Sequence, residues 1–97
     1  MATYIILSRF SPEAFEDPKE FLQMAEKVSG RIKKDCPGIR WKESYATLGR
    51  FDVLDVVEAD DPRQIEKAAM IIRGFGHSTT ETLVGTPWRD FLAGLKG

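Results

Sequence analysis

The chain has 97 residues, of which 42% are hydrophobic and 30% are charged, and its formal net charge is −1 at pH 7. This length suits a single domain, residues 1–97, and the composition is typical of a folded protein rather than a disordered one. The near-neutral charge argues against electrostatic binding to nucleic acid or to a membrane surface. The only cysteine, Cys36, cannot form an internal disulfide, and no apolar run approaches the roughly 20 residues that span a bilayer. We therefore expect a cytoplasmic protein.

The first third of the chain predicts a strand followed by a helix. Residues 3–10, TYIILSRF, are β-branched and apolar, which indicates a strand buried on both sides. After a loop, Asp17 suits the N-cap of a helix over 17–35, with Pro18 in its first turn and Glu20 placed to close a capping box. Its apolar residues recur at helical spacing on one face: Phe21, Leu22, Ala25, Val28 and Ile32.

The middle of the chain predicts a strand hairpin. Residues 39–48 alternate with period two, which indicates a strand with one more polar face. The connection LGR then predicts a short turn in which Gly49 adopts a positive φ. The next strand, FDVLDVVEA, is expected over residues 51–59.

The last third repeats the helix-then-strand pattern. Asp61 and Pro62 predict a second helix start, and Gly74 is the expected end of that helix. A threonine-rich strand is expected over 77–84. A short amphipathic helix is expected over 86–95, with four large apolar side chains on one face: Trp88, Phe91, Leu92 and Leu95.

The order of these elements predicts the fold class. The two Asp-Pro helix starts are 44 residues apart, which suggests a weak internal duplication of one strand-helix-strand unit. A βαββαβ order of this kind is typical of an α+β ferredoxin-like sandwich, in which two helices cover one face of a four-stranded antiparallel sheet.

The uncovered sheet face predicts a homodimer. Both central strands are apolar on both sides, so the face opposite the helices also presents large hydrophobic residues. The two sides are Tyr4, Ile6 and Phe10 against Ile5 and Leu7 in the first strand, and Phe51, Val53 and Val57 against Leu54 and Val56 in the other. Leaving such side chains in water would forgo about 1.5–3 kcal/mol each. We therefore expect a second copy to cover this open sheet face in a two-fold dimer. The alternative is that the terminal helix and the loops suffice to cover it.

The stretch TLGRFDVLDVVEADD, followed by GHSTTETL, resembles the GYD domain family of small bacterial proteins. The glycine–tyrosine–aspartate motif of that family here reads Gly49, Phe51 and Asp52, with Arg50 inserted. Phenylalanine in place of tyrosine removes any role for a phenol. The similarity extends to about residue 84 and includes the opening TYIILSRFSPE. It implies a fold of the dimeric α/β-barrel type, in agreement with the expected dimer, and it implies no particular activity.

The acids of the strand at 51–59 are the first candidate site residues. Asp55 lies in mid-strand between Val53 and Val57, where a carboxylate needs a partner, a ligand or a wet cavity. Asp52 and Glu58 share the opposite face. Any of the three could act as a base or a ligand anchor in a cleft. Alternatively, Asp52 and Glu58 bond turn amides or pair with nearby arginines.

Three residues of the preceding strand are candidate ligand contacts. By strict alternation Trp41, Glu43 and Tyr45 share one face, which could hold a flat organic molecule or simply form sheet packing. His77 is the second catalytic candidate beside Asp55. As the only histidine it cannot build a His-based metal cluster within one chain. No glycine loop for phosphates is present, so no cofactor is expected.

Two functions follow as the main hypotheses, and a third possibility is a purely structural assembly subunit. The first is a binding module or assembly domain that acts as a homodimer and holds a small organic molecule between sheet and helices. The second is a cofactor-independent oxygenase or isomerase, with substrate against Trp41 and Tyr45 and a proton moved by Asp55 or His77. An enzyme predicts a closed pocket of roughly 300 Å³ or more that contains a perturbed acid or histidine. A purely structural subunit predicts a dry dimer interface instead.

Overall fold

A computed structural model describes the backbone of residues 1–97 and the burial of each of them except Gly76. The predicted order of strands and helices is confirmed, with one additional 3-10 helix after the first strand. The elements are β1 (Ala2–Phe10), η1 (Pro12–Phe15), α1 (Pro18–Asp35), β2 (Arg40–Ala46), β3 (Val53–Ala59), α2 (Pro62–Gly76), β4 (Ser78–Gly85) and α3 (Trp88–Gly94).

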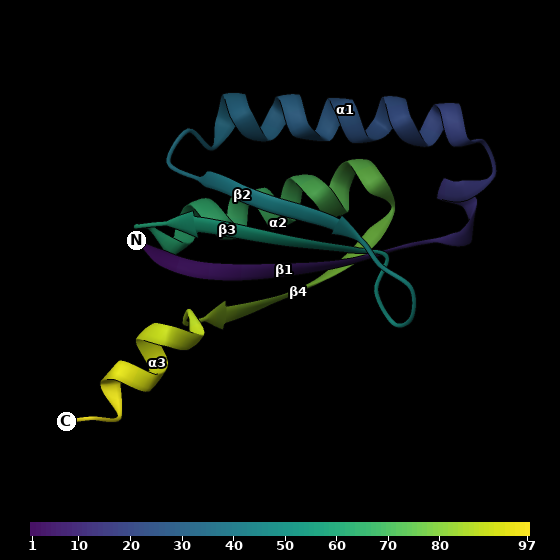
Figure 1. Ribbon diagram of the computed structural model, residues 1–97. Helices are drawn as coiled ribbons and strands as arrows, with labels where there is room; N and C mark the ends of the chain where they lie inside the picture. The colour runs from purple at the N-terminus through teal and green to yellow at the C-terminus, as the bar shows by residue number, and fades with distance from the viewer.

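The strands form one antiparallel sheet in the order β2-β3-β1-β4. Helices α1 and α2 lie on one face of this sheet, and α3 points away from the end of β4 (Figure 1). The fold is therefore the expected α+β ferredoxin-like sandwich with a short C-terminal helix. None of the helices in the described part of the chain is long and apolar enough to cross a membrane.

The helix starts follow their local chemistry. The carboxylates of Asp17 and Asp61 each accept a hydrogen bond of 2.9 Å from the backbone N–H two residues later, as N-caps do. The predicted end of α2 at Gly74 is wrong. One glycine inside a helix costs only about 1 kcal/mol, and α2 continues until His77 takes a left-handed conformation with φ 46°.

The β2–β3 connection is longer than the predicted three-residue turn. β2 ends at Ala46 and β3 begins at Val53, rather than at residues 48 and 51. Gly49 has φ 113°, so the expected positive φ is confirmed. Asp52 ties the connection to β1, because its backbone N–H donates to the Ser8 carbonyl at 2.8 Å.

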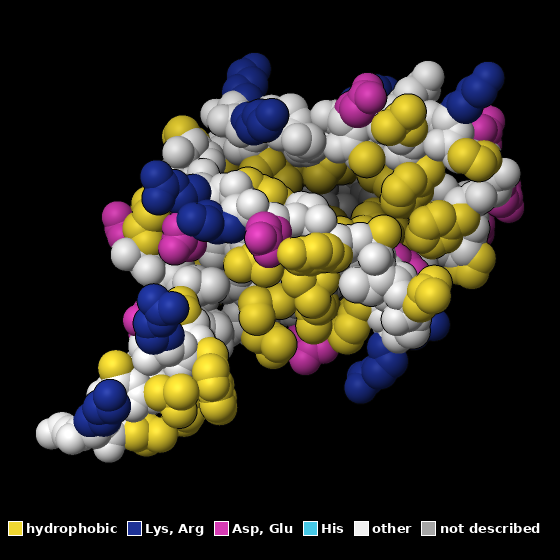
Figure 2. All heavy atoms as spheres, viewed as in Figure 1, with side chains coloured by type: hydrophobic (Ala, Val, Ile, Leu, Met, Phe, Trp, Pro, Cys, Tyr) yellow, Lys and Arg dark blue, Asp and Glu magenta, His cyan; other side chains and the backbone are white. Residues whose placement is uncertain are grey.

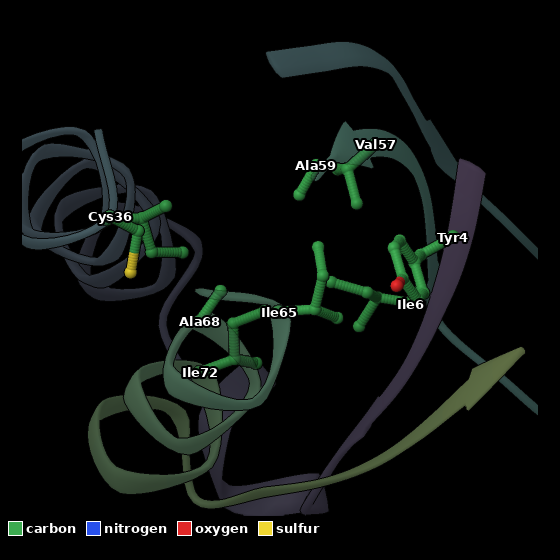
Figure 3. Close-up of a cluster of buried hydrophobic side chains, with 9 residues drawn as sticks. Tyr4, Ile6, Cys36, Val57, Ala59, Ile65, Ala68 and Ile72 are labelled. Atoms are coloured by element: carbon green, nitrogen blue, oxygen red, sulfur yellow. The ribbon is translucent and has the colours of Figure 1, made fainter. Parts of the chain in front are cut away.

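The hydrophobic core lies between the sheet and α2 (Figure 3). Ile6 and Val57 are fully buried on the helix-facing side of β1 and β3. α2 supplies Ile65, Ala68 and Ile72 to the same cluster, and Ile32 and Cys36 join it from α1 and its C-cap. Burial of each large aliphatic side chain stabilises the fold by about 1.5–3 kcal/mol.

Among the residues that the structure describes, no element covers the opposite sheet face. Ile5, Leu7, Leu54 and Val56 are only partly buried, and Leu83 beside them is 43% exposed. α3 leaves its apolar stripe in solvent, with Trp88 70% exposed. Hydrophobic side chains accordingly gather on the lower side of the sheet and along α3 (Figure 2). The expectation that one copy cannot bury both sheet faces is consistent with this arrangement.

Candidate ligand pocket beneath α1

A pocket of about 440 Å³ lies between α1 and the helix-facing side of the sheet. It exists because the backbone of α1 lies close to α2 and η1 and farther from the strands. Figure 2 shows the hollow under α1, bordered by hydrophobic side chains. The walls are largely apolar and include Phe10, Phe21, Met24, Val28, Ile32 and Ile72. A volume of this size is within the usual range for small-molecule sites.

Three aromatic rings hold one end of the pocket in place. Phe21 of α1 meets Phe10 of β1 edge to face at 5.3 Å and stacks on Phe15 of η1 at 4.9 Å. Aromatic pairs of this geometry contribute about 0.5–1.5 kcal/mol beyond their buried area. η1, which was expected to be part of a loop, therefore positions the start of α1 above the sheet.

A polar chain forms part of the pocket lining. The indole N–H of Trp41 donates to Ser44 Oγ at 2.8 Å, and Ser44 Oγ donates to Asp55 Oδ1 at 2.5 Å. Because Ser44 accepts from Trp41, its single proton is directed to the carboxylate. Asp55 is only 5% exposed, and it lines the pocket together with both partners. The prediction that Asp55 faces away from Glu58 is confirmed by the strand register, whereas Asp52 lies before the start of β3.

The environment of Asp55 makes its charged form less favourable than that of a carboxyl in water. Burial raises the pKa of this carboxyl above its ordinary value of 3.8, and hydrogen bonding to Ser44 and Trp41 offsets part of the rise. No ion pair to Asp55 is found among the described residues. Carboxyls tuned in this way occur at binding and proton-transfer sites, and also in structural networks.

Ser8 is a pocket residue that sequence reasoning missed. It lies on the helix-facing side of β1, is 1% exposed, and its hydroxyl has no hydrogen-bond partner among the described residues. The only signal in the sequence is a serine at a position where the alternation of β1 requires a buried apolar side chain.

The expectation that Trp41, Glu43 and Tyr45 share a face is wrong. The β2–β3 register shifts between Trp41 and Glu43, so that Lys42 is an extra residue in β2. Such a bulge reverses which side the following residues face. Trp41 thus lies on the helix side, whereas Glu43 and Tyr45 lie on the open face, opposite Val56 and Leu54.

Glu43 and Tyr45 form a pair of their own on the open face. The phenol donates to Glu43 Oε2 at 2.8 Å, and this hydrogen bond, with the carboxylate's charge, raises the pKa of Tyr45. Both side chains are exposed and neither lines the pocket beneath α1.

The other predicted site residues lie outside this pocket. Asp52 Oδ2 accepts the backbone N–H of Phe10 at 2.9 Å, so its carboxylate bonds an amide, as the alternative interpretation expected. Glu58 is on the open face, 3.9 Å from Arg40 and 3.8 Å from Lys42. His77 is exposed at the end of α2, where its carbonyl accepts from the N–H of Ser11 at 3.0 Å.

Neither a metal centre nor a reactive thiol is indicated. Within the described residues there is no group of three or more His, Cys, Asp and Glu side chains that could hold a metal ion. Cys36 is buried, and burial raises the pKa of its thiol, which disfavours the reactive thiolate.

The family model of the GYD domain matches residues 4–94 of the chain. The chain belongs to the GYD domain family. A relative in Thermus thermophilus, described as a glutamine synthetase and cystathionine beta-lyase binding protein, is 31% identical over 96 residues, which are 99% of this chain and 100% of the relative.

Solved structures resemble this GYD domain in fold. An ethyl tert-butyl ether D (EthD) family protein of Bacillus halodurans superposes with a TM-score of 0.57 at 15% identity, covering 90% of this chain and 99% of that one. The leucine response regulatory protein of Mycobacterium tuberculosis gives a TM-score of 0.57 at 13% identity and 89% coverage of this chain. The GYD domain spans about half of that regulator, 51% of its length.

The GYD motif itself has a structural role in this domain. Gly49 supplies the positive φ of the β2–β3 connection, and Asp52 bonds the amide of Phe10. Between them, the Phe51 carbonyl accepts from the Thr47 hydroxyl at 2.6 Å, and the Arg50 guanidinium lies 5.8 Å from the Phe51 ring centroid. The motif therefore shapes the connection and fixes it to β1, while the pocket residues lie elsewhere on the sheet.

Proposed function

We propose that this GYD domain is a binding protein that acts as a homodimer and holds a small, largely apolar organic molecule in the pocket beneath α1. The observation that carries the proposal is the 440 Å³ apolar pocket with the hydrogen-bonded Asp55 in its lining. Ligand sites commonly combine apolar walls with a few placed polar groups that orient the ligand. Of the predicted ligand contacts, Trp41 retains this role in the proposal. Glu43, Tyr45, Asp52 and Glu58 do not line the pocket.

The dimer part of the proposal rests on the open sheet face. Its central apolar side chains come from adjacent strands and form a continuous surface, with Leu83 opposite Ile5 and Val56 on the other side of Ile5. Large exposed apolar patches usually mark an interaction surface. A second copy presents the same patch, which suits an isologous two-fold contact. The exposed stripe of α3 extends beyond the sheet and would add contacts to that copy.

A second candidate function comes from the Thermus relative. Because similarity covers both chains almost completely, binding of an enzyme such as glutamine synthetase or cystathionine beta-lyase is a reasonable proposal for this chain. Purified enzyme of either kind should then co-elute with it in size-exclusion chromatography. The cytoplasmic location expected for this GYD domain stays a prediction.

The enzymatic alternative keeps one supporting observation. Asp55, a buried carboxyl with a raised pKa, faces an apolar pocket and could take or give a proton there. His77 does not line that pocket, so a paired acid and base within one copy is not supported. Isomerisation or oxygenation by this chain would therefore depend on Asp55 alone, and Asp55→Asn would abolish it.

Titration with ethylbenzene tests the pocket directly. The chain has two tryptophans, Trp41 in the pocket lining and Trp88 on α3. In a Trp88→Phe variant, fluorescence reports on Trp41 only. If the pocket binds ethylbenzene, the fluorescence of Trp41 should change along a saturable curve as ethylbenzene is added. A linear, non-saturating response, with no competition by other small aromatics, would contradict it.

A further inference from the structure

The pocket beneath α1 is lined by one buried oxygen atom without a protein partner among the described residues, Ser8 Oγ, and by the carboxyl of Asp55. Ser8 Oγ is buried and forms no hydrogen bond there. Asp55 uses Oδ1 to accept from Ser44, and no hydrogen bond to its Oδ2 is found in the same part of the chain. Both residues line the pocket. Buried polar groups in native proteins are overwhelmingly paired, and an unpaired one costs about 1–3 kcal/mol.

The strand register brings these two residues together on one face. Ser8 of β1 is opposite Val53 of β3, and Asp55 is opposite Ile6, so Ser8 and Asp55 are diagonal neighbours across the two strands. Diagonal positions of an antiparallel pair lie about 7–8 Å apart. One oxygen atom placed between the two side chains could therefore reach both at hydrogen-bond distance.

The chemistry of the pair selects one kind of group. Ser8 Oγ–H needs an acceptor, and Asp55 Oδ2 can accept a further hydrogen bond. A hydroxyl supplies both with a single atom and brings no charge into an apolar pocket. A carboxylate would meet the like charge of Asp55, and a hydrocarbon end would leave both protein groups unpaired.

We propose that the pocket takes a molecule with an apolar, ring-sized body and one terminal uncharged hydroxyl, which donates to Asp55 and accepts from Ser8. The proposal rests on the proposed function of the pocket. It defines the polar end of the ligand: alcohols and phenols should bind better than hydrocarbons or acids of the same shape.

Three probes of one shape test this preference. Dissociation constants of 4-ethylphenol, ethylbenzene and 4-ethylbenzoate would be measured by isothermal titration calorimetry at neutral pH. The phenol should bind about tenfold more tightly than ethylbenzene, since one well-placed buried hydrogen bond contributes on that scale. 4-Ethylbenzoate should bind most weakly of the three.

Two serine variants assign the effect to the pocket. Ser8→Ala should weaken 4-ethylphenol by about three- to tenfold and leave ethylbenzene unchanged. Ser11→Ala is the matched control, because Ser11 Oγ is also buried and unpartnered among the described residues but does not line this pocket. It should change neither constant. Both variants delete a hydroxyl without a partner, so both should fold.

The outcomes separate this inference from the proposed function. If ethylbenzene binds saturably but as tightly as 4-ethylphenol, or if Ser8→Ala leaves the phenol unaffected, the hydroxyl preference is wrong and the pocket remains. If none of the three probes binds, the pocket proposal fails, and the ligand class fails with it.

Discussion

The two faces of the sheet are built from the same strands but differ in which side chains they leave without a partner inside one copy. On the helix side, α2 covers the apolar residues, and the incomplete part is polar: Asp55 and Ser8 beside a pocket. On the open side, the incomplete part is apolar, from Ile5 to the half-exposed Leu83. The polar groups beside the pocket suit a small molecule with a polar end, whereas the exposed apolar residues of the open face suit a large apolar surface such as another copy.

This difference shows how alternation in one strand can serve two purposes. β1 places Ile6 and Ser8 on the helix side and Ile5 and Leu7 on the other. Neither side has the residues of a simple hydrophobic core. The helix side includes the hydroxyl of Ser8, and the residues of the open side remain partly exposed to solvent in a single copy. A period-two pattern with apolar residues on both faces therefore indicates two interaction surfaces, not just a deeply buried strand.

The largest expected effect is on the open face. Leu83→Asp should weaken the proposed homodimer at least about 100-fold, because two-fold symmetry would bring two carboxylates into an apolar interface at a cost of several kcal/mol. The fold should survive, since Leu83 is 43% exposed in one copy. Sedimentation equilibrium would show the particle change from twice the 11.0 kDa chain mass to that mass.

Val84→Asp is the matched control for this change. Val84 is the next residue, 75% exposed, and pairs with Tyr4, so it faces the helix side. It should leave the dimer intact. Equal dissociation by both variants would mean that the open face has no special role.

The pocket is expected to respond to a change on α1. Ala25 lines it from α1, and Ala25→Phe should fill part of its volume and weaken ethylbenzene about tenfold, the loss that follows from roughly 1.4 kcal/mol of displaced contact. Gln23→Phe adds the same ring on α1 outside the lining and should bind like the parent chain. The fluorescence of Trp41 in the Trp88→Phe chain would measure both. Equal loss in both variants would indicate a general effect of the added ring.

The parts of the fold that depend on local chemistry were predictable from the sequence. The caps at Asp17 and Asp61 and the positive φ of Gly49 follow from residue types and their neighbours, and all three are confirmed. The orientation of Asp55 was also predictable, because β3 is regular over Val53–Ala59 and its alternation is unbroken.

The site depended on pairing and packing that the sequence does not display. The bulge at Lys42 arises only when β2 meets β3, and it moves Trp41 to the pocket and Glu43 away from it. Ser44 belongs to no nucleophile motif, and its role as the link between Trp41 and Asp55 needs that same shift. The pocket itself exists because α1 rests on α2 and η1, which is a property of three elements together.

A smaller effect is expected for the acid of the GYD motif. Asp52→Ala should lower the free energy of unfolding by about 1 kcal/mol, because the Phe10 amide loses its charged acceptor. Binding of ethylbenzene should stay the same, since Asp52 does not line the pocket. Asp52→Asn keeps an acceptor oxygen and should lose less stability. A loss of binding with unchanged stability would contradict this account and indicate that Asp52 contacts the ligand.

The smallest expected effect is a change in how the free energy of unfolding depends on pH. The raised pKa of Asp55 means that, at pH values between the unfolded and the folded pKa, the folded chain holds a proton that the unfolded chain has released. The associated stability is fully present below the ordinary pKa of 3.8 and is lost as pH rises through the higher folded pKa. Asp55→Asn should remove this fall, as urea unfolding at a series of pH values would show, whereas Asp60→Asn at an exposed site should keep it.

The most direct test of the different roles of the two faces is a methyl NMR titration with 4-ethylphenol. Resonances of Val28, Val53 and Ile72, which line the pocket, should shift along one saturable curve. Those of Ile5, Val56 and Leu83, on the open face, should not follow it. Shifts confined to the open face, or spread equally over both faces, would contradict the assignment of the pocket beneath α1 to a small molecule.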